Sequence, residues 1–115
     1  MQVYYLEIVT KDVNGVCQAY AAANGLEFGD PDPALGNART AALPSGGLVG
    51  VRAPLRESEQ PIVRPYWLVN DIEAAVREVA QAGGVIALPP MPLPGHGSCA
   101  IYFAGGVEHG LWQKA

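Results

Sequence analysis

The sequence predicts an α+β fold built from two tandem β-α-β-β-β modules. Residues 3–25 and residues 62–84 share one pattern at a constant offset, in which an apolar segment is followed by an aspartate, an amphipathic segment and a glycine. Self-similarity at a fixed period is typical of duplicated structural units. We expect one domain over residues 1–115, with modules at 1–53 and 62–115 joined by a connection at 54–61, because neither module alone could bury enough apolar surface.

The first module begins with an apolar strand at Val3–Val9, rich in the β-branched and aromatic residues that favour strands. Asp12 then precedes apolar residues at i, i+3, i+4 and i+7 spacing, which predicts a helix with one apolar stripe facing a sheet. Asp12 is placed to cap the helix N-terminus, and Gly25 is placed to supply the positive φ of its C-terminus. Gly15 inside this helix costs about 1 kcal/mol relative to alanine.

Three shorter extended segments follow the first helix. We expect them near residues 27–29, 38–43 and 48–52, with turns at the Asp-Pro repeat of residues 30–33 and at residues 44–47. Residues 53–61 are polar and bounded by prolines, which is typical of an exposed connection.

The second module repeats this order. A strand at residues 62–69 precedes Asp71, which we expect to cap a helix whose C-terminus takes its positive φ from Gly84. Extended segments lie near 85–88, 98–104 and 107–113. Residues 89–97 are rich in proline and glycine. We interpret this segment as a flap over a binding cleft, and an ordinary connection between strands is the alternative.

Composition narrows the classes of partner. The net charge is −4 and no cluster of lysine or arginine occurs, which argues against nucleic acid and anionic membranes and favours a small uncharged or basic ligand. No stretch reaches the roughly 18 apolar residues of a membrane span, and no signal-peptide pattern is present, so we expect a cytoplasmic protein. Cys17 and Cys99 lack metal-like spacing and are expected to be small buried hydrophobic residues.

The duplicated module with an aspartate opening each helix resembles the vicinal oxygen chelate superfamily, which groups glyoxalase I, bleomycin-resistance proteins and extradiol dioxygenases. The C-terminal half carries the most specific part of the resemblance, in Gly83-Gly84, Pro89-Pro90-Met91, Ile101-Tyr102-Phe103 and Gly110-Leu111-Trp112-Gln113. The resemblance implies a glyoxalase-like fold, in which the mixed sheets curl into an open, cupped barrel with the helices outside. It also implies a ligand in the cup and a homodimer.

Enzymes of this superfamily hold a divalent metal with one side chain from the first strand and one from the last strand of each module. The resemblance and the repeat place these positions at Glu7, Tyr66, Val51 and Gly110. Only Glu7 is a usual metal ligand, whereas a catalytic site normally has about three protein ligands. We therefore expect no metal cofactor, with a divalent metal as the alternative.

Two histidines could add to this set. His109 adjoins Gly110, but the alternation of side chains along a strand turns it toward the helix layer or solvent. His96 could swing inward from the proline-rich segment, yet one histidine and one glutamate still fall short of a metal site.

Strand alternation also predicts which side chains line the cup. The expected ligand-binding residues are Tyr5, Arg64, Tyr66, His96, Tyr102 and Trp112, with Glu7 beside them as the candidate catalytic residue. An aromatic lining suits a flat or amphipathic molecule. In the alternative interpretation, these aromatic side chains simply fill a small barrel.

Glu7 is a carboxylate in the middle of an apolar strand, which is costly unless it is paired or protonated. The structural interpretation pairs it with Arg64 or with a tyrosine, and the functional interpretation makes it a general base or an anchor for a cationic group.

The sequence thus favours a metal-free small-molecule-binding protein similar to the drug-sequestering bleomycin-resistance proteins. The alternatives are a glyoxalase-like lyase or isomerase that uses Glu7 as its base, a metal-dependent dioxygenase, and an interaction module that only forms dimers.

Overall fold

The computed structural model describes residues 1–115 and confirms the α+β class. The elements in chain order are β1 (Val3–Val9), α1 (Val13–Asn24), a short 3-10 helix (Pro33–Leu35), β2 (Arg39–Ala42), β3 (Leu48–Arg52), β4 (Ile62–Leu68), α2 (Ile72–Gln81), β5 (Val85–Leu93), β6 (Gly97–Ala104) and β7 (Val107–Gln113). Two compact units are present, which we call the first unit (Tyr5–Val63) and the second unit (Met1–Tyr4 with Arg64–Ala115). No helix is long and apolar enough to cross a membrane.

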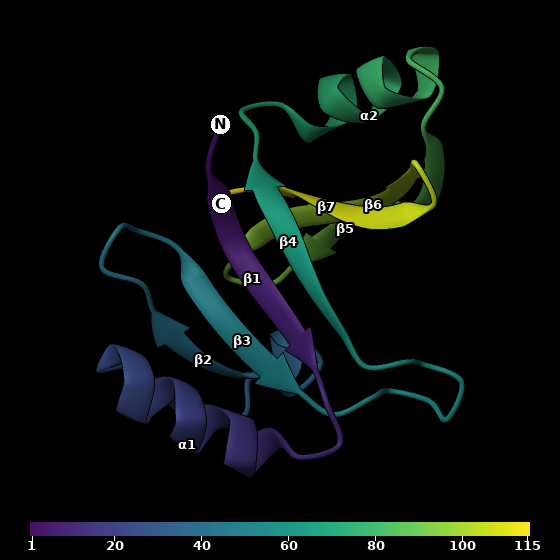
Figure 1. The fold of residues 1–115 in the computed structure, drawn as a ribbon. Coiled ribbons are helices and arrows are strands. Elements are labelled where there is room, and N and C mark those ends of the chain that lie inside the picture. Colours follow the sequence, from purple (N-terminus) through teal and green to yellow (C-terminus); the bar gives the residue numbers. More distant parts are fainter. The chain divides into compact units, whose positions relative to one another are not determined.

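The first unit holds three strands in the order β2-β3-β1, with β1 parallel and β2 antiparallel to β3. Helix α1 lies beside these strands (Figure 1). Its apolar stripe packs on one face of the sheet, in a core that contains Ile8, Cys17, Val49 and Val51. The expectation that Cys17 is a buried hydrophobic residue is confirmed, and Cys99 in the second unit is buried as well.

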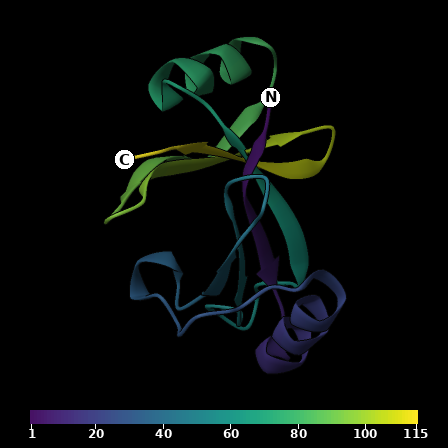
Figure 2. The same ribbon diagram turned by 90° about the vertical axis from the view of Figure 1, so that its left-hand side faces the viewer.

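The second unit holds four strands in the order β4-β7-β6-β5, with β4 parallel to β7 and the remaining pairs antiparallel. Helix α2 contacts β5, β6 and β7 and is seen beside this sheet in Figure 2. Ile72 on α2 packs against Ala100 and Leu111. We call the opposite sheet face in each unit the helix-free face.

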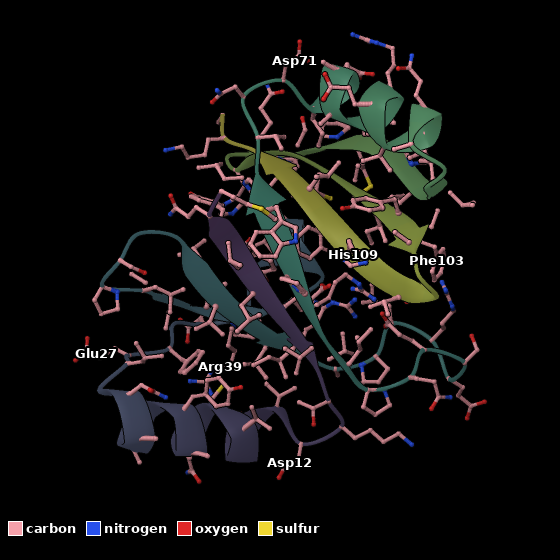
Figure 3. All side chains as sticks on the ribbon, turned by 45° about the horizontal axis from the view of Figure 1, so that its top comes forward. Asp12, Glu27, Arg39, Asp71, Phe103 and His109 are labelled. Atoms are coloured by element: carbon pink, nitrogen blue, oxygen red, sulfur yellow. The ribbon has the colours of Figure 1, made fainter.

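Both helices begin as the sequence predicts. The Asp12 side chain accepts a hydrogen bond from Gly15 N, and the Asp71 side chain accepts one from Ala74 N, each at 3.1 Å. A β-carbon on residue 15 would collide with the Asp12 carboxylate, so glycine makes room for the cap. The two aspartates lie at the starts of their helices in Figure 3.

The C-termini of the helices differ from each other. Gly25 has a φ of 66° and donates its N–H to Ala21 O, which confirms its predicted role. The same prediction for Gly84 is wrong, because Gly83 adopts the positive φ, of 99°. Glycine is required at position 84 for space, since a β-carbon there would lie 2.5 Å from Cγ1 of Val79.

The predicted strand at residues 27–29 is absent, so the first unit has one strand fewer than its counterpart. The Asp-Pro repeat that follows removes two backbone donors, and proline restricts the residue before it. A 3-10 helix forms instead, with the Asp32 side chain accepting from Ala34 N at 3.0 Å.

The proline-rich segment is mostly strand rather than a flap. Residues 89–93 continue β5, and only the turn from Pro94 to His96 connects β5 to β6. Strand β5 ends the strand order of its unit and has register shifts near Leu88 and Met91. Prolines are tolerated at a sheet edge and at bulges, because no neighbouring strand needs their missing N–H.

Candidate functional site

The two units differ by one residue in the register of their last strands. Tyr66 on β4 pairs with Gly110 on β7, whereas Glu7 on β1 pairs with Gly50 on β3. Gly50 is therefore the structural counterpart of Gly110, and the assignment of Val51 to this role is wrong. The Val51 side chain instead belongs to the core that packs on α1. A slip of one residue exchanges the two faces of a strand.

An aromatic ring covers each of these paired glycines. A β-carbon on Gly50 would overlap the phenol of Tyr5, and a β-carbon on Gly110 would overlap the ring of Tyr66. Glycine at both positions therefore allows a tyrosine ring to lie against the backbone of the adjacent strand. Neither position offers a side chain that could bind a metal.

The residues present do not fit the metal expected in enzymes of the resembled superfamily. The four corresponding positions hold Glu7, Gly50, Tyr66 and Gly110, of which only Glu7 is a usual ligand. No group of three or more histidine, cysteine, aspartate or glutamate side chains is gathered in a way that could hold an ion.

Glu7 lies in a buried ionic cluster of the first unit with Arg52 and Glu59. Arg52 Nε donates to Glu7 Oε2 at 2.8 Å, while Nη1 and Nη2 donate to the two carboxylate oxygens of Glu59 at 2.8 and 2.7 Å. The side chains of Arg52 and Glu7 are 7% and 8% exposed. The sequence analysis did not identify Arg52 or Glu59, although strand alternation places residue 52 on the same face as Gly50.

The charge of Arg52 is strongly favoured in this cluster. Hydrogen bonding to Glu59 raises the pKa of Arg52 above its ordinary value, desolvation opposes this, and the charge of Glu7 adds to the increase. The Glu7 carboxylate is thus held by a permanent cation. This contact favours a structural role for Glu7. To act as a general base, Glu7 would have to accept a proton, and this would weaken its charge-assisted hydrogen bond with Arg52.

Arg64 is also buried, at 5% exposure, and lies on the helix-free face of the second unit. Its Nη2 contacts Glu108 Oε1 at 3.0 Å. The expected residue Arg64 is therefore part of an ion pair within its own unit.

Three aromatic side chains of the second unit gather around Trp112. The ring of Tyr66 meets Trp112 edge-on at 5.8 Å between centroids, and those of Tyr4 and His96 lie 5.6 and 6.5 Å away. Trp112 Nε1 donates to His96 O at 3.2 Å. We call Tyr4, Tyr66, His96 and Trp112 the aromatic cluster. Three of its members were predicted, but Tyr4 was missed because alternation assigned it to the face opposite Tyr5.

The prediction that Tyr102 faces a cup is wrong. Tyr102 pairs with His109 across β6 and β7, and the two rings stack at 5.1 Å between centroids. Tyr102 packs with Ala100 and Leu111 in the core under α2. His109 shares this face of the sheet, because residues directly opposite each other in an antiparallel pair point to the same side. Of the two orientations expected for His109, toward the helix layer or toward solvent, the structure shows the first, and Figure 3 marks it beside Phe103 near the β6–β7 hairpin.

Burial separates the predicted lining into interior and accessible parts. Tyr5, Tyr66 and Trp112 are 2%, 5% and 1% exposed, which agrees with the interpretation that aromatic residues fill the interior. His96 is only half-buried, and so is Tyr4, which was not predicted. A hollow of about 410 Å³ lies near the start of α2, lined by residues 1–2, 68–71, 74–75 and 78, and it contains none of the predicted site residues.

No family model matches the chain. It is 28% identical over 115 residues to the protein named "Putative glyoxylase CFP32" of Mycobacterium tuberculosis and of Mycobacterium bovis, covering 95% of this chain. The chain spans 44% of the length of these curated relatives.

Solved structures confirm the glyoxalase-like fold. A hypothetical protein from Bacillus halodurans, BH1468, superposes with a TM-score of 0.77 at 19% identity, covering 99% of this chain and 94% of that one. Methylmalonyl-CoA epimerase from Mycobacterium tuberculosis gives 0.77 at 18% identity, with 98% and 87% covered. The epimerase from Streptomyces coelicolor, solved in complex with 2-nitronate-propionyl-CoA, gives 0.71 at 15% identity, with 100% and 95% covered. These likenesses concern the fold, which is the one that the resemblance to the vicinal oxygen chelate superfamily implies.

Proposed function

We propose that this chain is a small-molecule-binding protein of the glyoxalase and bleomycin-resistance type that works without a metal. The observation that carries this proposal is the set of residues at the four superfamily metal positions. Two are glycines covered by tyrosine rings, one is a tyrosine, and the fourth, Glu7, is bound to Arg52 at 2.8 Å. Such a set supplies one conventional ligand where about three are needed.

The aromatic cluster supports an aromatic or cationic ligand. Tyr4 and His96 are half-buried while Trp112 is buried behind them, so a flat molecule that inserts beside Tyr4 would meet several aromatic faces. Lys114 Nζ lies 5.8 Å from the centroid of the Tyr4 ring. This contact illustrates the affinity of the Tyr4 face for a cation.

Tryptophan fluorescence tests the proposed site. Aromatic metabolites and antibiotics are titrated into the untagged protein with EDTA present. We expect saturable quenching in the wild type and in Trp67→Phe, and its loss in Trp112→Phe. Trp67 is the matched control because it packs in the core under α2. Thermal shifts of each variant report binding independently of fluorescence. The proposal fails if no compound shifts the melting temperature, or if EDTA abolishes the binding.

An isomerase is the second candidate, because methylmalonyl-CoA epimerases share this fold. In this alternative, Glu7 abstracts a proton next to a carbonyl, and a tyrosine hydroxyl stabilises the resulting enolate. Glu7→Gln separates the two functions. It should abolish turnover by an isomerase, whereas it should weaken the binding of an uncharged ligand only modestly.

We also propose that the chain forms a homodimer, as the superfamily resemblance implies. Val85 and Phe103 are directly opposite each other on β5 and β6 and remain 63% and 41% exposed. An exposed apolar pair next to a sheet edge is typical of an interface. Analytical ultracentrifugation should show a dimer that Phe103→Glu dissociates. A wild-type monomer at micromolar concentration would reject this proposal.

A further inference from the structure

Two Asn-Gly sequences lie in the first unit, one at each end of α1. Asn14-Gly15 is in the first turn of the helix, and Asn24-Gly25 is at its C-terminus. In such a sequence, the backbone nitrogen of glycine can attack the carboxamide carbon of asparagine, because glycine has no β-carbon to hinder the approach. Ring closure requires a local opening of the helix, so the contacts of each pair decide which asparagine reacts.

The Asn14-Gly15 pair is held by two charged side chains. Arg39 Nη1 donates to Asn14 Oδ1 at 3.0 Å, and Gly15 N donates to Asp12 Oδ1 at 3.1 Å. The Asp12 carboxylate also opposes the loss of the Gly15 amide proton, because it accepts a hydrogen bond from that N–H group. Hydrogen bonds to charged groups each typically shift an equilibrium about tenfold or more toward the bonded state. This pair is therefore protected.

The contacts of the Asn24-Gly25 pair are neutral and local. Asn24 Nδ2 donates to Tyr20 O at 3.2 Å, and Gly25 N donates to Ala21 O at 2.9 Å. Residues 22–25 are exposed, and a β-carbon on Gly25 would meet open space. Because helix ends fray at little cost, this pair can open without breaking a contact to another element.

We propose that Asn24 is a site of spontaneous covalent modification by deamidation. The Gly25 amide gives up its proton to water, its nitrogen forms a bond to Asn24 Cγ, and the Cγ–Nδ2 bond breaks with release of ammonia. Water then opens the resulting five-membered imide at one of its two carbonyl carbons, which gives aspartate or isoaspartate. The inference goes beyond the proposed function, because it concerns the covalent chemistry of α1 rather than the binding of a ligand.

The modification should weaken the end of α1. Both products place a negative charge at the helix C-terminus, where the helix dipole is itself negative. Isoaspartate also adds a methylene group to the main chain, which displaces Gly25 from its C-cap position with a φ of 66°. We expect the modified chain to unfold at a lower urea concentration than the unmodified chain.

The experiment uses the wild-type chain, in which Asn14-Gly15 is the matched internal control. The protein is incubated at mildly alkaline pH, with and without urea, and mass spectrometry quantifies deamidation in the peptides that span each pair. In the folded chain, Asn24 should react at least about tenfold faster than Asn14. In urea the two rates should become similar, because neither pair retains its folded contacts. Equal rates in the folded chain, or a faster reaction at Asn14, would overturn the inference.

Two variants test the physical cause of the difference. Asp12→Ala removes the carboxylate that holds Gly15 N, so it should accelerate the reaction of Asn14 and leave that of Asn24 unchanged. Asn24→Gln keeps a carboxamide but disfavours closure of the ring, so its urea midpoint should stay constant during the incubation while that of the wild type falls. An unchanged rate at Asn14 in the first variant, or an equal fall of the midpoint in the second, would also overturn the inference.

Discussion

The two units use the same strand and helix plan for different chemistry. Each has a helix capped by an aspartate, a parallel pair of strands, and a glycine covered by a tyrosine ring. Two residues after that glycine, the first unit carries Arg52 in an ionic cluster, and the second carries Trp112 in the aromatic cluster. The duplicated backbone therefore accommodates either a buried charged side chain or a buried aromatic one at this position, provided that neighbouring side chains pair with the charge or pack against the ring.

The largest expected effect comes from removing the ionic centre. Arg52→Met leaves Glu7 and Glu59 without their shared guanidinium, and breaking a buried ion pair typically costs about 3–5 kcal/mol. Urea denaturation at neutral pH should show a loss of this size. The additional changes Glu7→Gln and Glu59→Gln should recover much of it. A loss below about 1 kcal/mol would mean that the cluster does not organise the first unit.

The paired glycines test whether the two units share one packing device. Gly50→Ala and Gly110→Ala each push a methyl group into a tyrosine ring, and overpacking of this kind costs about 1–3 kcal/mol. Gly29→Ala is the control, because the nearest atom to its β-carbon would be Thr40 O at 3.9 Å. Chemical denaturation of the three variants should separate the control from the other two. A large loss in only one unit would break the proposed equivalence of Gly50 and Gly110.

The helix caps should contribute equally in the two units. Asp12→Ala and Asp71→Ala each remove one side-chain hydrogen bond of 3.1 Å, for an expected loss of about 1 kcal/mol. Thermal unfolding measures both. Gly15→Ala should be tolerated better in the Asp12→Ala background than in the wild type, since the carboxylate that the new methyl group would meet is then absent. A loss well above about 1 kcal/mol for one cap alone would contradict their equivalence.

The smallest effect on stability concerns the thiol of Cys17, which lies on the buried face of α1. Burial raises the pKa of Cys17, and the charge of Arg39 lowers it by less. The unfolded chain therefore loses this proton at a lower pH than the folded chain. Its contribution to stability is full below the ordinary thiol pKa and is lost as the pH rises through the raised value. Urea midpoints between about pH 8 and pH 10 should fall more steeply for the wild type than for Cys17→Ala, and equal slopes would contradict this.

The sequence predicted the helices, their N-caps and all seven strands, β5 only over its first residues, because these elements depend on local periodicity and capping. Alternation within β1 and β4 also placed Glu7 and Tyr66 correctly on the helix-free faces. Errors arose where the outcome depends on register between strands. A one-residue difference in strand register makes Gly50, rather than Val51, the counterpart of Gly110. Tyr102, which pairs with His109, lies under α2 rather than on the helix-free face.

Arg52 shows why the ionic cluster could not be found from local patterns. It is separated from Glu7 by 45 positions, and its second partner comes from a connection without regular structure. The extension of β5 over residues 89–93 was also missed, because it too depends on tertiary placement rather than on a local pattern. Proline disfavours strands in general, and only a place at the sheet edge makes it acceptable.

Metal analysis of the untagged protein tests the central claim most directly. The protein is purified without chelators, its zinc, nickel, manganese, iron and magnesium are quantified by mass spectrometry, and ligand binding is measured on the same sample before and after EDTA. The account predicts a metal content far below one ion per chain and unchanged binding of an aromatic ligand. Stoichiometric metal that Glu7→Gln removes, together with loss of binding in EDTA, would contradict it.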